Sequence, residues 1–200
     1  MRQSNKMDYK GDLYYIKEIL KGNLNAYSYI VDRHKDHAYN LAYRICGNRE
    51  DAEEVVQDSF LKAYSSLEGF KMKSTFSTWL FRIVYNTSIT LLRQKKRTPV
   101  SIDDFPAEYS DFRWISSSEE ETEMEYRKTL VNFALQKLNS EDRGLIGLYY
   151  FEELNFDEIS EVTGLSKSNI KVRLYRARQK MLETIQNAEK NSIIYHEKIS

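Results

Sequence analysis

Apolar residues recur at helical spacing along most of this 200-residue chain, and no other sequence feature constrains its fold as strongly. Side chains three or four positions apart share one face of a helix, whereas a half-buried strand needs strict alternation of apolar and polar residues. We find no convincing run of such alternation. The sequence therefore predicts an all-α protein.

The only two prolines, Pro99 and Pro106, lie in one stretch near the middle of the chain that has no usable period. Proline interrupts helices because it lacks a backbone N–H, so this stretch is the natural domain boundary. We expect two small helical domains joined by a flexible acidic linker, with a helix-turn-helix in the second. The predicted parts are an N-terminal domain over residues 1–97, a linker over 98–119, a C-terminal domain over 120–187 and a tail over 188–200.

Capping residues mark the expected helix ends. Gly47 suits the left-handed conformation that ends many helices, and Asn48 suits the position before the first turn of the next one. In the N-terminal half we expect helices over about 24–47, 48–69 and 74–97. In the C-terminal half the predicted helices begin at Ser118, Ser140, Asn155 and Ser166 and end near Leu138, Tyr150, Val162 and Asn187.

The last two of these helices flank Gly164. A short helix, a glycine turn and a basic helix form the pattern that places a recognition helix in the major groove of DNA. At about 100° per residue, one stripe of the final helix faces the preceding helices. This stripe is formed by Ile170, Leu174, Ala177 and Met181. The opposite face carries Ser168, Val172 and Arg176, flanked by Asn169 and Tyr175.

The formal net charge of zero hides a strong asymmetry between segments. Residues 1–100 hold 17 Lys and Arg against 11 Asp and Glu, whereas residues 101–128 hold 3 against 9. The final helix carries Lys167, Lys171, Arg173, Arg176, Arg178 and Lys180 with no acid between them. Such a cluster is typical of a phosphate-binding surface, and a solvated cationic face is the alternative explanation.

Three separate stretches resemble the extracytoplasmic-function sigma factors, the small two-domain initiation subunits of bacterial RNA polymerase. The likeness covers about residues 10–97 and 120–187. The stretches are Asp51-Ala-Glu-Glu-Val-Val-Gln-Asp-Ser-Phe-Leu-Lys-Ala-Tyr64, Ser74-Thr-Phe-Ser-Thr-Trp-Leu-Phe-Arg-Ile-Val-Tyr-Asn-Thr87, and Phe156-Asp-Glu-Ile-Ser-Glu-Val-Thr-Gly-Leu-Ser166 followed by Val172-Arg-Leu-Tyr-Arg-Ala-Arg178. The resemblance implies a promoter-recognition factor that binds core polymerase.

The first stretch would dock on the clamp coiled coil of the largest polymerase subunit. The expected contacts are Asp51, Glu54, Gln57 and Asp58. Glu54 and Asp58 are four residues apart, so they share one helical face that can meet a basic partner helix. The alternative is the ordinary solvated face of an amphipathic helix.

The second stretch, with the loop before it, would bind the minus-10 element and capture its bases as the strands separate. Aromatic rings for stacking, amides for base edges and cations for the backbone suit this task. The expected contacts are Ser66, Phe70, Lys73, Trp79, Arg82, Asn86, Arg93 and Lys96. Asn86 stands where the family carries a residue lining the flipped-base pocket. For Phe70 and Trp79 the alternative is a place in the core.

The third stretch would read the minus-35 element of the promoter. The expected contacts are Ser168, Asn169, Lys171, Val172, Arg173, Arg176 and Lys180. Arg176 is the leading candidate for base readout, because a guanidinium can pair bidentately with guanine. Val172 departs from the family pattern, in which many relatives carry Ser, and this leaves the promoter sequence open.

The expected partners are core polymerase, promoter DNA and an anti-sigma factor, and the expected location is the bacterial cytoplasm at the nucleoid. We expect no cofactor, no metal and no membrane insertion, because no apolar run reaches about 18 residues. An enzyme would need a phosphate loop, metal-ligand spacing or a nucleophile constellation, and we find none of these. The remaining alternatives are a free-standing DNA-binding regulator and a helical signalling module.

Overall fold

The computed structural model describes residues 9–97 and 119–197, and within them it contains helices and turns but no strand. The N-terminal part comprises α1 (Tyr9–Leu20), α2 (Asn25–Cys46), α3 (Arg49–Ser65), a 3-10 turn (Leu67–Gly69) and α4 (Phe76–Arg97). The C-terminal part comprises α5 (Glu119–Gln136), α6 (Ser140–Ile146), a π-helical turn (Gly147–Phe151), α7 (Phe156–Thr163) and α8 (Lys167–Glu197). The all-α prediction is confirmed. Most of the predicted linker lies outside the described residues.

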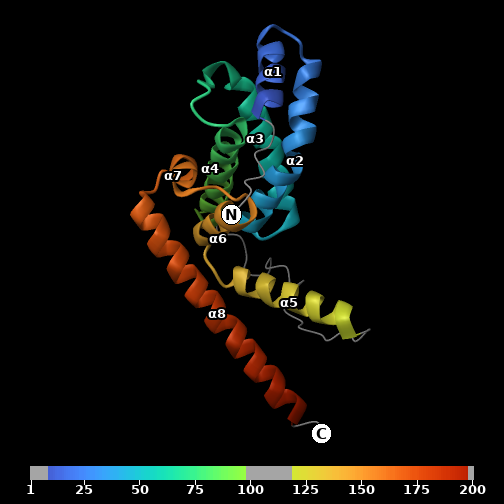
Figure 1. Ribbon diagram of the computed structural model, residues 1–200, viewed down its shortest axis with the longest axis vertical. Coiled ribbons are helices and arrows are strands. Elements are labelled where there is room, and N and C mark those ends of the chain that lie inside the picture. The colour runs from blue at the N-terminus through green and yellow to red at the C-terminus, as the bar shows by residue number, and fades with distance from the viewer. Residues whose placement is uncertain (1–8, 98–118, 198–200) are drawn as a thin grey trace.

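Helices α2, α3 and α4 pack against one another to form the core of the N-terminal part (Figure 1). Their buried stripes meet in an apolar core that includes Leu41, Val55, Phe60 and Leu80. Burial of such side chains from water is the main favourable term in folding. The helical periodicity thus predicted the faces that form this core.

The end of α2 and the start of α3 follow the predicted capping chemistry. Gly47 has φ +85° and donates its N–H to the carbonyl of Tyr43, while the Asn48 side chain accepts from the N–H of Asp51 at 2.8 Å. These contacts satisfy backbone groups that a helix end leaves unpaired. Helix α3 itself ends at Ser65, and the short 3-10 turn occupies the residues up to Gly69.

Helix α1 was not predicted. It packs on α2 through Ile16 and Ile19 and also buries Asp12, whose side chain faces α2. The Asp12 carboxylate lies 3.1 Å from Nε2 of His34 and 3.3 Å from Nε of Arg33. A buried carboxylate needs such partners because losing its water shell is costly.

Three predicted boundaries in the C-terminal part were wrong. The N-cap of α6 is Asn139, whose side chain accepts from the Asp142 N–H at 2.8 Å, and not Ser140. The helix expected to reach Tyr150 changes at Gly147 to a π-helical turn. In this turn the Glu152 N–H donates a hydrogen bond to the Gly147 carbonyl at 3.1 Å. Helix α8 continues to Glu197, so most of the expected tail is helical.

The two parts share one continuous core, because α6 packs on α2 and α7 packs on α4 (Figure 1). A Cβ on Gly144 would lie 2.9 Å from the Tyr85 ring, so only glycine allows this approach of α6. Helices α5 and α8 extend away from the N-terminal bundle. The structure thus has two helical parts, and α6 and α7 hold them together.

Candidate nucleic-acid interface

Helices α7 and α8 form the predicted helix-turn-helix. Ile170, Leu174 and Ala177 are buried on the inner side of α8, in the same core as Ile159 and Val162 of α7. The outer side leaves Ser168, Asn169, Val172, Tyr175 and Arg176 exposed. The predicted division of α8 into a core face and an open face is confirmed. The open face begins at the helix N-terminus, the end with which recognition helices contact base edges.

The turn between the two helices is fixed by short polar contacts. Asn155, the predicted start of this helix, forms a capping box with Glu158, and Gly164 ends the helix with φ +73°. The Ser160 hydroxyl donates to the carbonyl of Leu165 at 2.7 Å, and Ser166 accepts from the N–H of Asn169 at 3.3 Å. These contacts set the direction in which α8 leaves the turn.

The cations of α8 differ in how free they are to meet a phosphate. Arg176 and Lys180 are exposed. The Lys171 ammonium lies 5.2 Å from the centre of the Phe156 ring, at the edge of the open face. Arg173 was predicted to contact DNA. In the structure it is ion-paired with Asp142 at 2.6 Å and Glu141 at 3.0 Å, so these two acids compete with a phosphate for its guanidinium.

A second polar surface runs along α4. Arg82 and Asn86, four residues apart, are exposed on one side of the helix, as the predicted contacts require. Lys96 is exposed near the C-terminal end, and Arg93 lies 3.6 Å from Glu141 of α6. An amide and several cations therefore follow one another along α4.

The aromatic residues beside this surface are less accessible than predicted. Phe70 is only 7% exposed, and its ring packs against Phe76 and Trp79 with centre-to-centre distances of 5.9 and 5.2 Å. Edge-on and tilted arrangements of this kind are typical of aromatic packing in a core. The prediction that Phe70 stacks on a base is therefore withdrawn, whereas Trp79 stays partly exposed.

The loop before α4 joins the two parts of the protein. Ser66 and Lys73 are exposed, and the Ser66 hydroxyl donates to the carbonyl of Lys62. At the end of the loop, the Ser74 hydroxyl donates to Glu161 of α7 at 2.7 Å. The helix-turn-helix thus contacts the segment that leads into the α4 surface.

The candidate docking face of α3 carries Glu54, Gln57 and Asp58, all exposed. Asp51 does not belong to it. Its side chain is 5% exposed, accepts from the Asn48 amide at 3.0 Å and pairs with Lys95, so the predicted polymerase contact is replaced by a capping role. Leu61, which was not predicted, is 69% exposed one turn beyond Gln57 and Asp58. The helical spacing alone could have indicated it.

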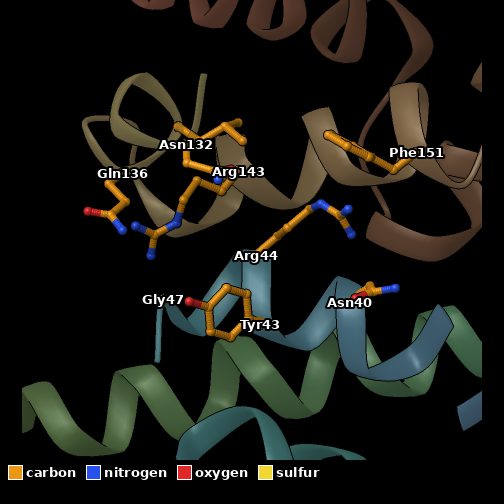
Figure 2. Close-up of a pocket in the computed structure, with 9 residues that line it drawn as sticks. Asn40, Tyr43, Arg44, Gly47, Asn132, Gln136, Arg143 and Phe151 are labelled. Carbon is orange, nitrogen blue, oxygen red and sulfur yellow. The ribbon is translucent and has the colours of Figure 1, made fainter. Parts of the chain in front are cut away.

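A small cavity of about 190 Å³ lies between α2, α5 and α6 (Figure 2). Arg44 extends to the Phe151 ring, 3.7 Å from its centre, and Arg143 donates to the Ile45 carbonyl at 2.7 Å. Burial lowers the pKa of both guanidinium groups. Arg143 thereby caps the C-terminal end of α2 from the other part of the protein. The cavity is smaller than the roughly 300 Å³ of typical ligand pockets, and we assign it to the interface between the two parts.

Among residues 9–97 and 119–197 there is no group of His, Cys, Asp and Glu side chains that could hold a metal ion. The described helices also include none with the length and apolar character needed to cross a membrane.

Comparison with known proteins gives two family matches, to sigma-70 region 2 over residues 30–98 and to sigma-70 region 4 over residues 130–181. The extracytoplasmic-function (ECF) sigma factor SigW of Bacillus subtilis (strain 168) is 31% identical over 179 residues, 86% of this chain and 95% of that protein. The sigma factor SigV of the same organism is 35% identical over 74% of this chain and 83% of its own length. The chain belongs to the ECF sigma factors of the sigma-70 family. Its function is that of an RNA polymerase sigma factor in promoter recognition and initiation.

Solved structures share this fold. CnrH, in complex with the cytosolic domain of CnrY, superposes with a TM-score of 0.63 at 25% identity, covering 88% of this chain and 98% of CnrH. The sigma factor RpoE of Bartonella quintana, in complex with the anti-sigma factor NepR, gives a TM-score of 0.61 at 22% identity, with 82% of this chain and 98% of RpoE covered.

Proposed function

We propose that this chain joins core RNA polymerase through α3, reads the minus-35 element with α8 and the minus-10 element with α4, and promotes opening of the DNA. The observation that carries the proposal is the pair of separate exposed polar surfaces, one on each matched sigma region. In this proposal residues 1–97 and 120–187 act as the two functional domains. The polymerase supplies the chemistry, and the chain itself has no catalytic role.

The minus-35 surface is the open face of α8. Its proposed contacts are Ser168, Asn169, Lys171, Val172, Arg176 and Lys180, all exposed. Arg176 lies among base-facing residues and would pair with guanine. Lys171 and Lys180 would meet the phosphate backbone, which supplies affinity without sequence information.

The minus-10 surface comprises the loop before α4 and the exposed side of that helix. Its proposed contacts are Ser66, Lys73, Trp79, Arg82, Asn86, Arg93 and Lys96. Asn86 offers a donor and an acceptor, which can both pair with the edge of an extruded base. The cations would hold the backbone of the separated strand, as in other single-strand grooves.

The proposed polymerase surface is the face of α3 with Glu54, Gln57, Asp58 and Leu61. Exposed acids beside a large exposed apolar side chain suit a partner helix that is basic and partly apolar. An anti-sigma factor is a further proposed partner, since RpoE, which shares the fold, was solved with one. The proposed location is the cytoplasm, where the polymerase and the chromosome are.

Reconstituted transcription with sigma-free core polymerase tests this proposal. The chain should join core polymerase and yield specific transcripts from a promoter library, and Asp58→Lys should weaken both because it reverses a charge on the docking face. Glu18→Lys, on α1, is the matched control and should leave both intact. Specific binding to duplex DNA without any transcript would instead support a free-standing regulator. Failure to bind DNA or core would favour a signalling module.

A further inference from the structure

Val172 is an apolar side chain in the middle of the polar open face of α8. Its side chain is 46% exposed, and it belongs neither to the buried core nor to the apolar residues packed against that core. Ser168 and Arg176, one helical turn before and after it, are exposed as well. Packing within this protein therefore gives no reason for valine at this position.

The residues next to Val172 in sequence are directed elsewhere. Arg173 is held by Asp142 and Glu141 of α6, and the Lys171 ammonium lies over the Phe156 ring. The surface around Val172 is therefore free of their long cationic side chains. A base pair presented to this part of α8 would meet the two methyl groups of valine.

Valine has neither a donor nor an acceptor in its side chain, so it cannot pair with the polar groups of a base edge. In the major groove the one apolar group is the C5-methyl of thymine. We propose that Val172 recognises a thymine in the upstream promoter element through this methyl group. The proposal rests on the proposed reading of the minus-35 element by α8.

The spacing along the helix places this thymine relative to the base that Arg176 contacts. Four residues of helix advance about 6 Å, and base pairs are stacked about 3.4 Å apart. If α8 lies along the groove, the two contacts are about two base pairs apart. Because arginine favours guanine, the expected element contains a thymine at about that distance from a guanine.

Uracil substitution tests the proposal, because uracil is thymine without the methyl group. Upstream elements are first selected from a duplex library with the full chain bound to core polymerase, and each thymine is then replaced singly by uracil. Loss of one buried methyl should weaken binding about fourfold at a single position. With Val172→Ser, which replaces the two methyl groups by a hydroxyl, the same replacement should have no effect.

Leu182→Ser is the matched control, because Leu182 is 49% exposed on the same helix but ten residues farther along. It should keep the fourfold sensitivity to uracil. The proposal is overturned if no uracil replacement weakens binding of the unmodified chain, or if Val172→Ser leaves the sensitivity intact. Failure to select any duplex would contradict the proposed function instead, so the two failures are distinguishable.

Discussion

Among single residues, buried polar side chains tie α1 to the rest of the N-terminal part. Asp12 is 2% exposed and His34 is fully buried, and the contact between them ties α1 to α2. Arg33 adds a cation beside the same carboxylate. Removing one partner from such a cluster leaves the others desolvated and unpaired, which costs more than the pair contributed.

We therefore predict that Asp12→Ala lowers the free energy of unfolding by about 3 kcal/mol. Urea denaturation monitored by circular dichroism measures this change. Asp32→Ala is the control, because Asp32 pairs with Lys35 at an exposed site and should give no measurable change. Equal effects of the two substitutions would show that the buried cluster does not hold α1.

Nothing in the sequence indicated this cluster. Asp12 and His34 are 22 residues apart in the sequence. Asp12 looks like an ordinary exposed polar residue there, because its segment has no capping signal that would indicate a helix. Likewise, Asp51, Phe70 and Arg173 carry side chains suited to their predicted roles, and only tertiary contacts show that these side chains are already occupied. Residue type and spacing predict which chemistry is possible, whereas accessibility depends on the fold.

Cys46 is a buried thiol beside the end of α2. Burial raises its pKa to about 11, opposed by a hydrogen bond with Ser88. Because the thiolate is the reactive form, a raised pKa leaves about a hundredfold less of it at pH 8 than an ordinary thiol would have.

Iodoacetamide should therefore alkylate Cys46 at least about a hundredfold more slowly in the folded chain than in urea at pH 8. Mass spectrometry of the alkylated protein over time measures both rates. Alkylation at similar rates in the two conditions would contradict a packed structural role for this thiol.

Among the helices, residues that cap a helix end were predictable from sequence, whereas the end of α8 and the π-helical turn were not. Gly47 was identified as a helix end and Asn155 as a helix start because their backbone requirements are local. The end of α8 was missed because nothing after Asn187 stops a helix, and no glycine or proline follows. The π-helical turn depends on bonds made by Gly147 and Leu148 that no propensity encodes.

On α4, the exposed amide of Asn86 leads to a prediction about DNA opening. Asn86→Ala should slow opening of the minus-10 element at least about tenfold, because one base-edge contact that forms after strand separation is lost. A fluorescent base analogue in that element measures opening by the chain bound to core polymerase. Binding to a duplex carrying only the minus-35 element should be unchanged, and equal losses in both would remove Asn86 from the flipped-base site.

At the scale of the whole molecule, the two parts are docked through α6 and α7. The minus-35 and minus-10 elements are named for positions 25 base pairs apart, which corresponds to about 85 Å of duplex. In the docked arrangement, Ser74 beside α4 contacts α7, and α8 begins only a few residues later. While its two parts are docked, one molecule therefore cannot place α4 on the minus-10 element and α8 on the minus-35 element at the same time. The proposed function requires the two parts to separate.

Separation must break a closely fitted interface. Gly144 packs against Tyr85, Arg143 caps α2, and Nδ1 of His37 lies 2.7 Å from Oε2 of Glu152. Burial raises the pKa of that carboxyl, against the effect of the His37 hydrogen bond. The fit of Gly144 could not be predicted from sequence, because the Ile45 and Tyr85 side chains that exclude a Cβ come from α2 and α4.

Gly144→Ala should weaken docking by about 1 to 3 kcal/mol, because its Cβ would overlap the Tyr85 ring. Fluorescence energy transfer between dyes on α2 and α8 should report a larger mean separation. Gly69→Ala is the control, because a Cβ there meets no atom within 4 Å. An unchanged separation in Gly144→Ala would show that the parts are not held by this contact.

The central claim, that this chain turns core polymerase into an enzyme that opens promoters, is tested most directly by permanganate, which oxidises unpaired thymines. On a promoter selected with this chain, core polymerase plus the chain should make thymines in and just downstream of the minus-10 element reactive. Neither component alone should do so. Protection of the minus-35 element without any reactive thymine would contradict the claim and leave only a duplex-binding protein.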